Sequence, residues 1–396
     1  MKRNNNTLSL KATSPKLLRR YVRLLLWLNN ISYKDPYLDM VERIIKLITL
    51  SGRPMSVQYL KGAKLHMDHY LAGSPVFKSG QTPRIAISKS SGLPLIIPSS
   101  LRDLIARRDL GCIRVVAGLL SIFRVIPLKG EPKLSTITDP FKGLTETLNE
   151  EKLLSIYNDF FLKLRGSNPQ GKDFPLPLMT AGPNYKISMF GATMDAYAFT
   201  EVLLNPFTTL SRYFGSNLHL TLNNEREYAS DLGLNKELKL GKLSAKQEAA
   251  GKVRIFAILD VWSQTALQPI HQHIFSILKK IPNDGCFDQE APLKRLLGKG
   301  LMNTYSYDLS AATDRFPIAL QEQVLSLIYT KEIASCWKQL LINRDYHFKS
   351  QVYQYSVGQP MGALSSWGVF SLSHHFVVQY AARKCGFVDW FDDYAL

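Results

Sequence analysis

The feature that most restricts the fold is a strand, a tight turn and a helix in direct succession, an order that occurs twice in the C-terminal quarter of the chain. In the first occurrence, 303–309 favours a strand through its Thr and Tyr content. Pro317 can open the helix that follows, and Val324, Leu325 and Ile328 are spaced to lie on its buried side. Strands that alternate with helices predict an α/β architecture.

The second occurrence surrounds a glycine-rich loop. Tyr353, Tyr355 and Val357 alternate as in a strand, and a helix is expected over about 365–383. The intervening segment 358–362 has two glycines around a proline, so its backbone can bend and approach a nucleotide closely. Serines at the start of the helix would add the phosphate-binding potential of a helix N-terminus. An ordinary strand-to-helix turn has the same composition, so the loop is informative only together with other segments.

Two aspartates flank the turn of the first occurrence. Asp308 lies at the end of the expected strand and Asp314 just before the helix. A carboxylate at a strand end, followed by a tight turn, is a common position for Mg²⁺, which takes oxygen ligands and accompanies phosphates. Asp314 fits a second interpretation equally well, as a residue that starts a helix.

A basic segment precedes both. Lys252 and Arg254 alternate with Val253 and Ile255, so in an extended strand both cations project to the same side. Arg can bind a phosphate chain bidentately, and Lys acts as a point charge. A solvent-facing strand would look the same. The run 264–280 is typical of a helix that packs on this strand.

The charge balance indicates a polyanionic partner. Lys and Arg outnumber Asp and Glu by 49 to 32, a net charge of +17, which favours nucleic acid over a merely basic surface. The first 34 residues carry eight of these cations and no acid. Within them, the amphipathic run 17–27 is either a mitochondrial targeting segment or a helix that binds RNA phosphates. No stretch is apolar enough to span a bilayer, because the best candidate, 115–128, is short and contains Arg124.

Taken in order, these segments resemble motifs F, A and B of viral RNA-dependent RNA polymerases. The resemblance is closest to mitoviruses, capsidless RNA elements of mitochondria, and rests on Ala250–Arg254, Asp308–Arg315 and Gly358–Gly362. It covers roughly 246–396. A reverse transcriptase fits less well, because the last two segments match enzymes that copy RNA into RNA better.

The resemblance implies an α/β right-hand polymerase. A mainly helical N-terminal and fingers region, 1–165 and 166–300, would precede an incomplete palm at 301–396, with the thumb absent. The long Gly- and Pro-rich run 166–184 is a plausible surface loop at the first boundary. Asp308 and the 358–362 loop would face the same cavity.

The resemblance also implies roles for individual residues. Lys252 and Arg254 would hold the triphosphate of the incoming nucleotide. Asp308 would be catalytic and the first metal ligand, Asp314 would sense the ribose, and Ser366 would stand near the ribose and the templating base. The further nucleotide-binding residues that it implies are Gly358, Gln359, Gly362 and Ser365. The complete enzyme would use two Mg²⁺ (or Mn²⁺) ions, an RNA template and nucleoside triphosphates, and would act in mitochondria.

The chain departs from the family pattern at its end. The family's Gly-Asp-Asp hairpin, which completes the metal site, does not occur in these residues. Asp392 and Asp393 look like its lead-in, with a degenerate hairpin as the rival interpretation. A fragment, a relic copied into a host genome, and one half of a split polymerase completed by a second chain all fit. A non-catalytic RNA-binding protein derived from a polymerase is the alternative of a different class.

Overall fold

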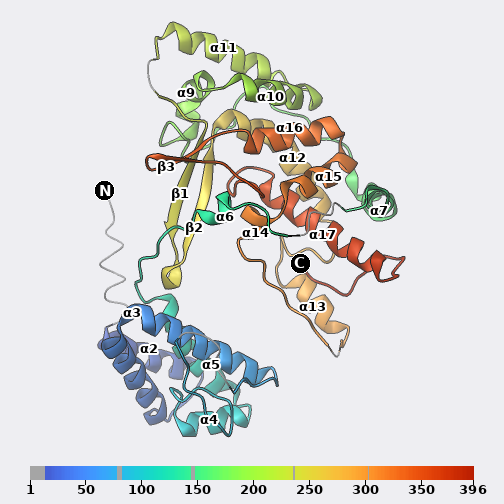
Figure 1. The fold of residues 1–396 in the computed structure, drawn as a ribbon. Helices are drawn as coiled ribbons and strands as arrows, with labels where there is room; N and C mark the ends of the chain where they lie inside the picture. Colours follow the sequence, from blue (N-terminus) through green and yellow to red (C-terminus); the bar gives the residue numbers. More distant parts are fainter. Residues whose placement is uncertain (1–13, 78–82, 144–147, 235–236, 302) are drawn as a thin grey trace. The chain divides into compact units, whose positions relative to one another are not determined.

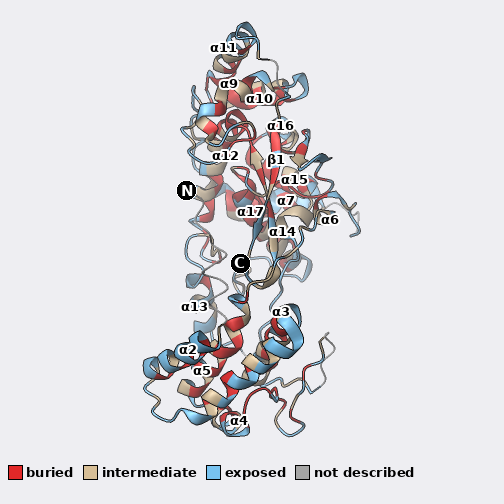
Figure 2. Ribbon diagram, turned by 90° about the vertical axis from the view of Figure 1, so that its left-hand side faces the viewer, coloured by how far each residue is buried: buried red, intermediate tan, exposed pale blue. Residues whose placement is uncertain are grey.

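The computed structural model describes residues 14–77, 83–143, 148–234, 237–301 and 303–396. These form two compact units. The first comprises residues up to 132 together with 246–254, and the second comprises 133–245 and 255–396. Buried residues, red in Figure 2, gather on the inner faces of the helices in each unit. No helix in the described ranges is both long enough and apolar enough to cross a bilayer.

The first unit is helical (Figure 1). The basic run predicted to be helical starts helix α2, which Ser14 caps by accepting a hydrogen bond from the Leu17 amide at 3.3 Å. Gly52, with φ +72°, kinks the long helix α3 just before Pro54, and the helix continues to Leu71. The unit's elements are α2 (Pro15–Leu28), α3 (Asp35–Leu71), α4 (Ser99–Ala106), α5 (Leu110–Leu120), η1 (Ser121–Arg124) and η4 (Ala249–Gly251).

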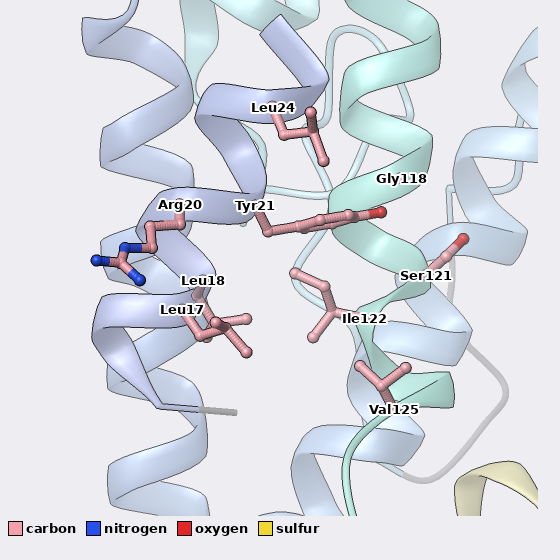
Figure 3. A pocket seen from close by; sticks show the side chains of 9 residues that line it. All are labelled: Leu17, Leu18, Arg20, Tyr21, Leu24, Gly118, Ser121, Ile122 and Val125. Atoms are coloured by element: carbon pink, nitrogen blue, oxygen red, sulfur yellow. The ribbon is translucent and has the colours of Figure 1, made fainter. Parts of the chain in front are cut away.

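Helix α2 contributes to the core of this unit. Leu18, Val22 and Leu26 are buried, as expected for residues spaced four apart on one helix face. On another face, Leu17 and Tyr21 line an apolar cavity of about 430 Å³ between α2 and α5 (Figure 3). The basic amphipathic run is therefore a packed helix of the folded unit. The predicted choice between targeting and RNA binding remains open, and residues 1–13 lie outside the described residues.

The second unit contains most of the helices and a small sheet (Figure 1). The sheet has the strand order β2-β1-β3-β4; β1 and β3 are parallel, with Lys242 opposite His347, and β3 and β4 are antiparallel. The strands are β1 (Gly241–Gln247), β2 (Val253–Leu259), β3 (Tyr346–Phe348) and β4 (Gln351–Tyr353). The outer ends of β1 and β2 belong to the first unit.

The helices of this unit form one continuous core with the sheet. The helical elements are α6 (Ser135–Thr138), α7 (Glu150–Ile156), η2 (Tyr157–Phe161), α8 (Leu162–Arg165), η3 (Ser188–Gly191), α9 (Ala192–Tyr197), α10 (Glu201–Tyr213), α11 (Leu218–Asp231), α12 (Val261–Leu278), α13 (Ala291–Gly298), α14 (Ala312–Arg315), α15 (Ile318–Ile328), α16 (Lys331–Ile342) and α17 (Ser366–Lys384). Helices α12 and α17 pack together, and Gly368 permits this contact because a Cβ there would lie 3.1 Å from the Phe275 ring.

A buried polar cluster fixes the start of α12. The Asp260 carboxylate accepts a hydrogen bond from the Ser263 amide at 2.7 Å and pairs with Arg344 at 2.6 Å. Asp195 of α9 accepts hydrogen bonds from the Val261 amide at 3.1 Å and from the Asn184 side chain at 2.7 Å. Burial, and then the nearby charge of Asp260, raise the pKa of Asp195 to about 8.

The predicted helices are confirmed, and so is the 166–184 loop. Helix α15 buries Val324, Leu325 and Ile328, as predicted, and α17 begins at Ser366 after Ser365. The contact-based division into two units does not test the predicted division at 165 and 300, which remains a prediction.

Two strand predictions were wrong. Residues 303–309 form no strand: all are exposed, Tyr305 by 82% and Tyr307 by 88%, and in the described part of the chain no neighbouring strand pairs with them. Strand β4 ends at Tyr353 rather than including Tyr355 and Val357. The two residues are buried, but the Ser356 amide between them donates to the Ile137 carbonyl, outside any strand.

Candidate nucleotide-binding site

Three segments that are far apart in the sequence meet in the second unit. They are helix α6, the turn around α14, and the start of the glycine-rich loop. The Gly358 amide donates to the Asp314 carbonyl, and the Gln359 amide to the Thr313 carbonyl, both at 3.0 Å. Helix α6 contacts α14, and its Ile137 carbonyl accepts the Ser356 amide at 3.0 Å. Main-chain hydrogen bonds thus join the predicted motif A turn to the predicted motif B loop.

Both glycines of the loop are required by close backbone approaches. A Cβ at Gly358 would lie 2.2 Å from the Thr313 carbonyl oxygen. At Gly362, φ is +120°, and a Cβ would lie 2.2 Å from the Ala257 carbonyl oxygen. The Gln264 side chain of α12 donates to the Gly362 carbonyl at 3.0 Å and accepts the Leu364 amide at 2.8 Å. The loop is therefore fixed to α14, β2 and α12.

The polar side chains of the loop point into the protein. Gln359 is fully buried, and its amide nitrogen donates to the Ser366 carbonyl at 3.0 Å and to Gln321. Ser365 is 1% exposed and adopts φ +71°, and its hydroxyl accepts the indole N–H of Trp337 at 2.8 Å. Ser366 is buried as well. In this structure the three residues shape the loop, and their roles in binding a nucleotide remain predictions.

Asp314 lies at the junction of the three segments. Its Oδ2 accepts a hydrogen bond from the Thr136 hydroxyl of α6 at 2.8 Å. Burial raises the pKa of Asp314, and the Thr136 hydrogen bond and the charge of Arg315 oppose this shift. Asp314 lies in the first turn of α14, whose N-terminus has no side-chain cap, and its carboxylate contacts α6.

Asp308 is exposed on the extended segment before this turn. The described contacts connect Thr313 and Asp314, not Asp308, to the loop. A cavity of about 270 Å³ opens between α6 and α14, lined by Ser135, Thr136, Asp139, Lys142, Ser310, Ala311 and Arg315. Neither Asp308 nor the 358–362 loop lines it, so the predicted shared cavity remains a prediction. Within the described ranges, no group of three or more His, Cys, Asp or Glu residues is arranged to hold a metal.

Lys252 and Arg254 lie in the first unit, at the β1–β2 tip, where Lys252 directly precedes β2 and Arg254 is its second residue. Both are exposed, whereas Ile255 is buried, as the predicted alternation requires. Arg254 forms an ion pair with Glu248 at 2.9 Å. The Gln247 side chain anchors the tip, because its amide donates to the Gly130 carbonyl and its oxygen accepts the Gly130 amide, both at 2.9 Å.

The two C-terminal aspartates are held by cations of α13. Asp392 pairs with Arg295 at 2.5 Å and with Lys299 at 2.6 Å, and Asp393 pairs with Lys299 at 2.8 Å. Burial opposes ionisation of Asp392, but the hydrogen bonds from Lys299 and Arg295 prevail and lower its pKa. In this structure both carboxylates are therefore engaged in ion pairs.

A buried histidine fixes the same segment. His375 of α17 contacts Asp284 at 3.0 Å and the Tyr394 hydroxyl at 2.7 Å. His375 is thus a fully buried, hydrogen-bonded residue of the core.

Sequence comparison relates the chain to viral polymerases. A family model described as mitovirus RNA-dependent RNA polymerase matches residues 168–396. The RNA-directed RNA polymerase of Cryphonectria parasitica mitovirus 1 is 32% identical over 418 aligned residues, which cover 97% of this chain and 50% of that protein.

Two uncharacterized mitochondrial proteins of Arabidopsis thaliana also match. They are 36% and 31% identical over 115 and 118 residues, covering 28% and 27% of this chain and 46% and 55% of their own lengths. The chain thus spans about half the length of the curated relatives that it matches. Because the family model covers more than half of the chain, and its motif segments lie within the matched region, the chain belongs to the mitovirus RNA-dependent RNA polymerase family.

Proposed function

We propose that this chain contributes the fingers and part of the palm to an enzyme that synthesises RNA on an RNA template by two-metal nucleotidyl transfer. The observation that carries the proposal is the hydrogen-bonded junction between the Asp314 turn and the Gly358–Gly362 loop. Such a junction supplies a rigid main-chain surface beside an acidic segment, and phosphoryl transfer depends mostly on positioning and charge neutralisation.

Asp308 fits the role of first metal ligand in its chemistry. An exposed carboxylate is a hard oxygen donor of the kind that Mg²⁺ prefers. Bound Mg²⁺ would activate the attacking hydroxyl and neutralise the phosphates. Asp308 supplies only part of an octahedral set, so the remaining ligands must come from the substrates, water and a second acidic segment.

The exposed cations at the β1–β2 tip fit the triphosphate. Lys252 is an exposed point charge, whereas Arg254 would exchange its partner Glu248 for a phosphate. Their anchoring through Gln247 limits the conformational entropy lost when a nucleotide binds. RNA is the expected polymer partner because of the net charge of +17. We place the activity in mitochondria on the strength of the family and of the Arabidopsis relatives.

The test is templated incorporation of nucleotides, with Asp308→Asn as the critical variant. The 396-residue polypeptide should give no product alone and should become active when a polypeptide carrying the Gly-Asp-Asp hairpin and thumb is added, fused or separate. In that completed enzyme Asp308→Asn should abolish synthesis, because the amide keeps the shape of the side chain and loses the charge that holds the metal. Asp231→Asn, at an exposed position that ends α11, is the matched control.

The alternative is a non-catalytic RNA-binding protein derived from a polymerase. It is favoured by the absence, among the described residues, of a cluster able to hold a metal. RNA binding by a completed protein that never incorporates nucleotides would support this alternative. Mg²⁺-dependent synthesis by the 396-residue chain alone would instead assign catalytic roles to Asp392 and Asp393.

A further inference from the structure

The residue that binds the Asp314 carboxylate lies outside the region matched by the family model. That region begins at residue 168, whereas Thr136 belongs to α6, 178 positions before Asp314. The Thr136 hydroxyl lies 2.8 Å from Asp314 Oδ2 and 3.2 Å from the Lys133 carbonyl oxygen. A hydroxyl has one proton to donate. The shorter contact, to the charged acceptor, is the stronger hydrogen bond.

Helix α6 is held in place by the other two segments of the junction. Arg315, next to Asp314, donates to the carbonyls of Asp139 at 2.5 Å and Pro140 at 2.8 Å. Ser356, just before the glycine-rich loop, donates its amide to the Ile137 carbonyl at 3.0 Å, and its hydroxyl lies 2.5 Å from the Asp139 carbonyl oxygen. Thr136 therefore presents its hydroxyl from a backbone that is fixed on both sides.

The hydrogen bond leaves one oxygen of Asp314 available. Oδ2 is bound to Thr136, and among the described residues Oδ1 has no hydrogen-bond partner. An ionised carboxylate accepts hydrogen bonds through both oxygens. With Oδ2 fixed, the rotation of the carboxylate is restricted, and Oδ1 has a defined direction in which it can accept a hydroxyl.

We propose that Thr136 is a positioning residue for sugar selection, which orients Asp314 so that its free oxygen accepts the 2′-hydroxyl of an incoming ribonucleotide. This inference rests on the proposed polymerase function. The arrangement would discriminate against a 2′-deoxyribonucleotide, because without the 2′-hydroxyl the polar group that binds it is left buried and unpaired.

The charge of Asp314 depends on the same contact. Burial raises the pKa of Asp314, and the Thr136 hydrogen bond lowers it. The neighbouring titratable or charged groups are Arg315, which also favours the carboxylate, and Tyr355, whose ionisation Asp314 opposes. Loss of the Thr136 hydroxyl should raise the pKa of Asp314 further. As the pH is lowered, the variant should therefore lose the ionised carboxylate, and with it sugar selection, at a higher pH than the wild type does.

The test compares three variants in α6 of the completed enzyme, with Asp314→Ala as a reference. Thr136→Val removes the donor and keeps the shape, and Thr136→Ser keeps the donor. Thr138→Val is a matched control on the exposed side of the same helix, where the hydroxyl faces the Leu134 carbonyl. The measurement is the ratio of kcat/KM for a ribonucleoside triphosphate to that for its 2′-deoxy analogue, from pH 6 to pH 9.

We expect Thr136→Val to lower the ratio by about tenfold, the size of a lost hydrogen bond to a charged group, and to shift its pH profile upward. Thr136→Ser and Thr138→Val should retain the wild-type ratio and profile. Equal losses for both substrates, with the ratio unchanged, would overturn the inference, since they indicate a merely structural contact. The inference would also be overturned if Thr136→Val left the ratio unchanged while Asp314→Ala changed it. Complete absence of synthesis by the wild-type completed enzyme would instead refute the proposed polymerase function.

Discussion

The buried carboxyl of Asp195 should make the stability of the second unit fall as the pH rises. Its pKa is about 8 in the folded protein, against an ordinary value of 3.8. Between these values the folded state holds a proton that the unfolded state has released. Stability is therefore fully present below about pH 4 and is lost as the pH rises to about 8. One proton corresponds to about 1.36 kcal/mol per pH unit, so about 2.7 kcal/mol is lost between pH 5 and pH 7.

Urea denaturation of the wild type and of Asp195→Asn at several pH values measures this effect. The amide cannot ionise, so its contribution is independent of pH. The Val261 amide and the Asn184 side chain both donate to Asp195, and an asparagine can accept only one of them through its oxygen. The variant therefore carries a constant penalty of about 1–3 kcal/mol for a buried donor left unpaired.

The difference between the two proteins isolates Asp195, because other titrating groups and the constant penalty cancel in its pH dependence. The free energy of unfolding of the variant, relative to the wild type, should increase by about 2.7 kcal/mol from pH 5 to pH 7. A relative stability that does not change over this range would show that Asp195 is ionised in the folded protein. The cluster with Asp260 and Arg344 would then hold two negative charges.

Two further predictions concern the loop and RNA. Gly358→Ala should lower the free energy of unfolding by about 2–4 kcal/mol, because its Cβ would lie 2.2 Å from a carbonyl oxygen. Gly298→Ala is the control and should leave the free energy of unfolding unchanged, because its Cβ would meet nothing within 4 Å. Thermal denaturation of both variants measures the difference. In filter-binding assays, the affinity of the protein for single-stranded RNA should fall steeply as the salt concentration rises. The double variant Arg20→Gln, Arg23→Gln should make this dependence on salt less steep, and it leaves the buried face of α2 intact. An affinity that does not depend on salt would contradict the electrostatic argument.

Periodicity predicted the helices near the C-terminal end of the chain well. The spacing of Val324, Leu325 and Ile328 identified the buried side of α15, because a helix forms locally and its face is encoded in adjacent turns. The prediction of a strand at 303–309 was wrong because a strand, unlike a helix, depends on a partner elsewhere in the chain. Tyr and Thr favour a strand only where a neighbouring strand supplies hydrogen bonds and packing, and none in the described residues does so here.

The part of the candidate site that the sequence predicted is the loop, because its two glycines are needed for close backbone contacts. Gly358 and Gly362 were identified from the loop motif, and the structure supplies the reason in two backbone approaches. Thr136 and Gln264 were missed because nothing in their local sequence differs from an ordinary helix. Their partners, Asp314 and the loop backbone, lie 178 and about 100 positions away. Only the folded chain brings these pairs together.

The polar side chains of the glycine-rich motif point into the protein, so the motif determines the shape of the loop rather than supplying side chains to a ligand. Gln359 and Ser365 bond to Ser366 and Trp337 within the protein, so a ligand approaching the loop meets its backbone rather than these side chains. The exposed residue of the motif is Gly362, whose carbonyl Gln264 already holds. The motif therefore specifies the shape of a main-chain surface. We therefore expect chemical recognition to depend on side chains from other segments, and the predicted candidates are Asp308 and Asp314 in the second unit and Lys252 and Arg254 in the first.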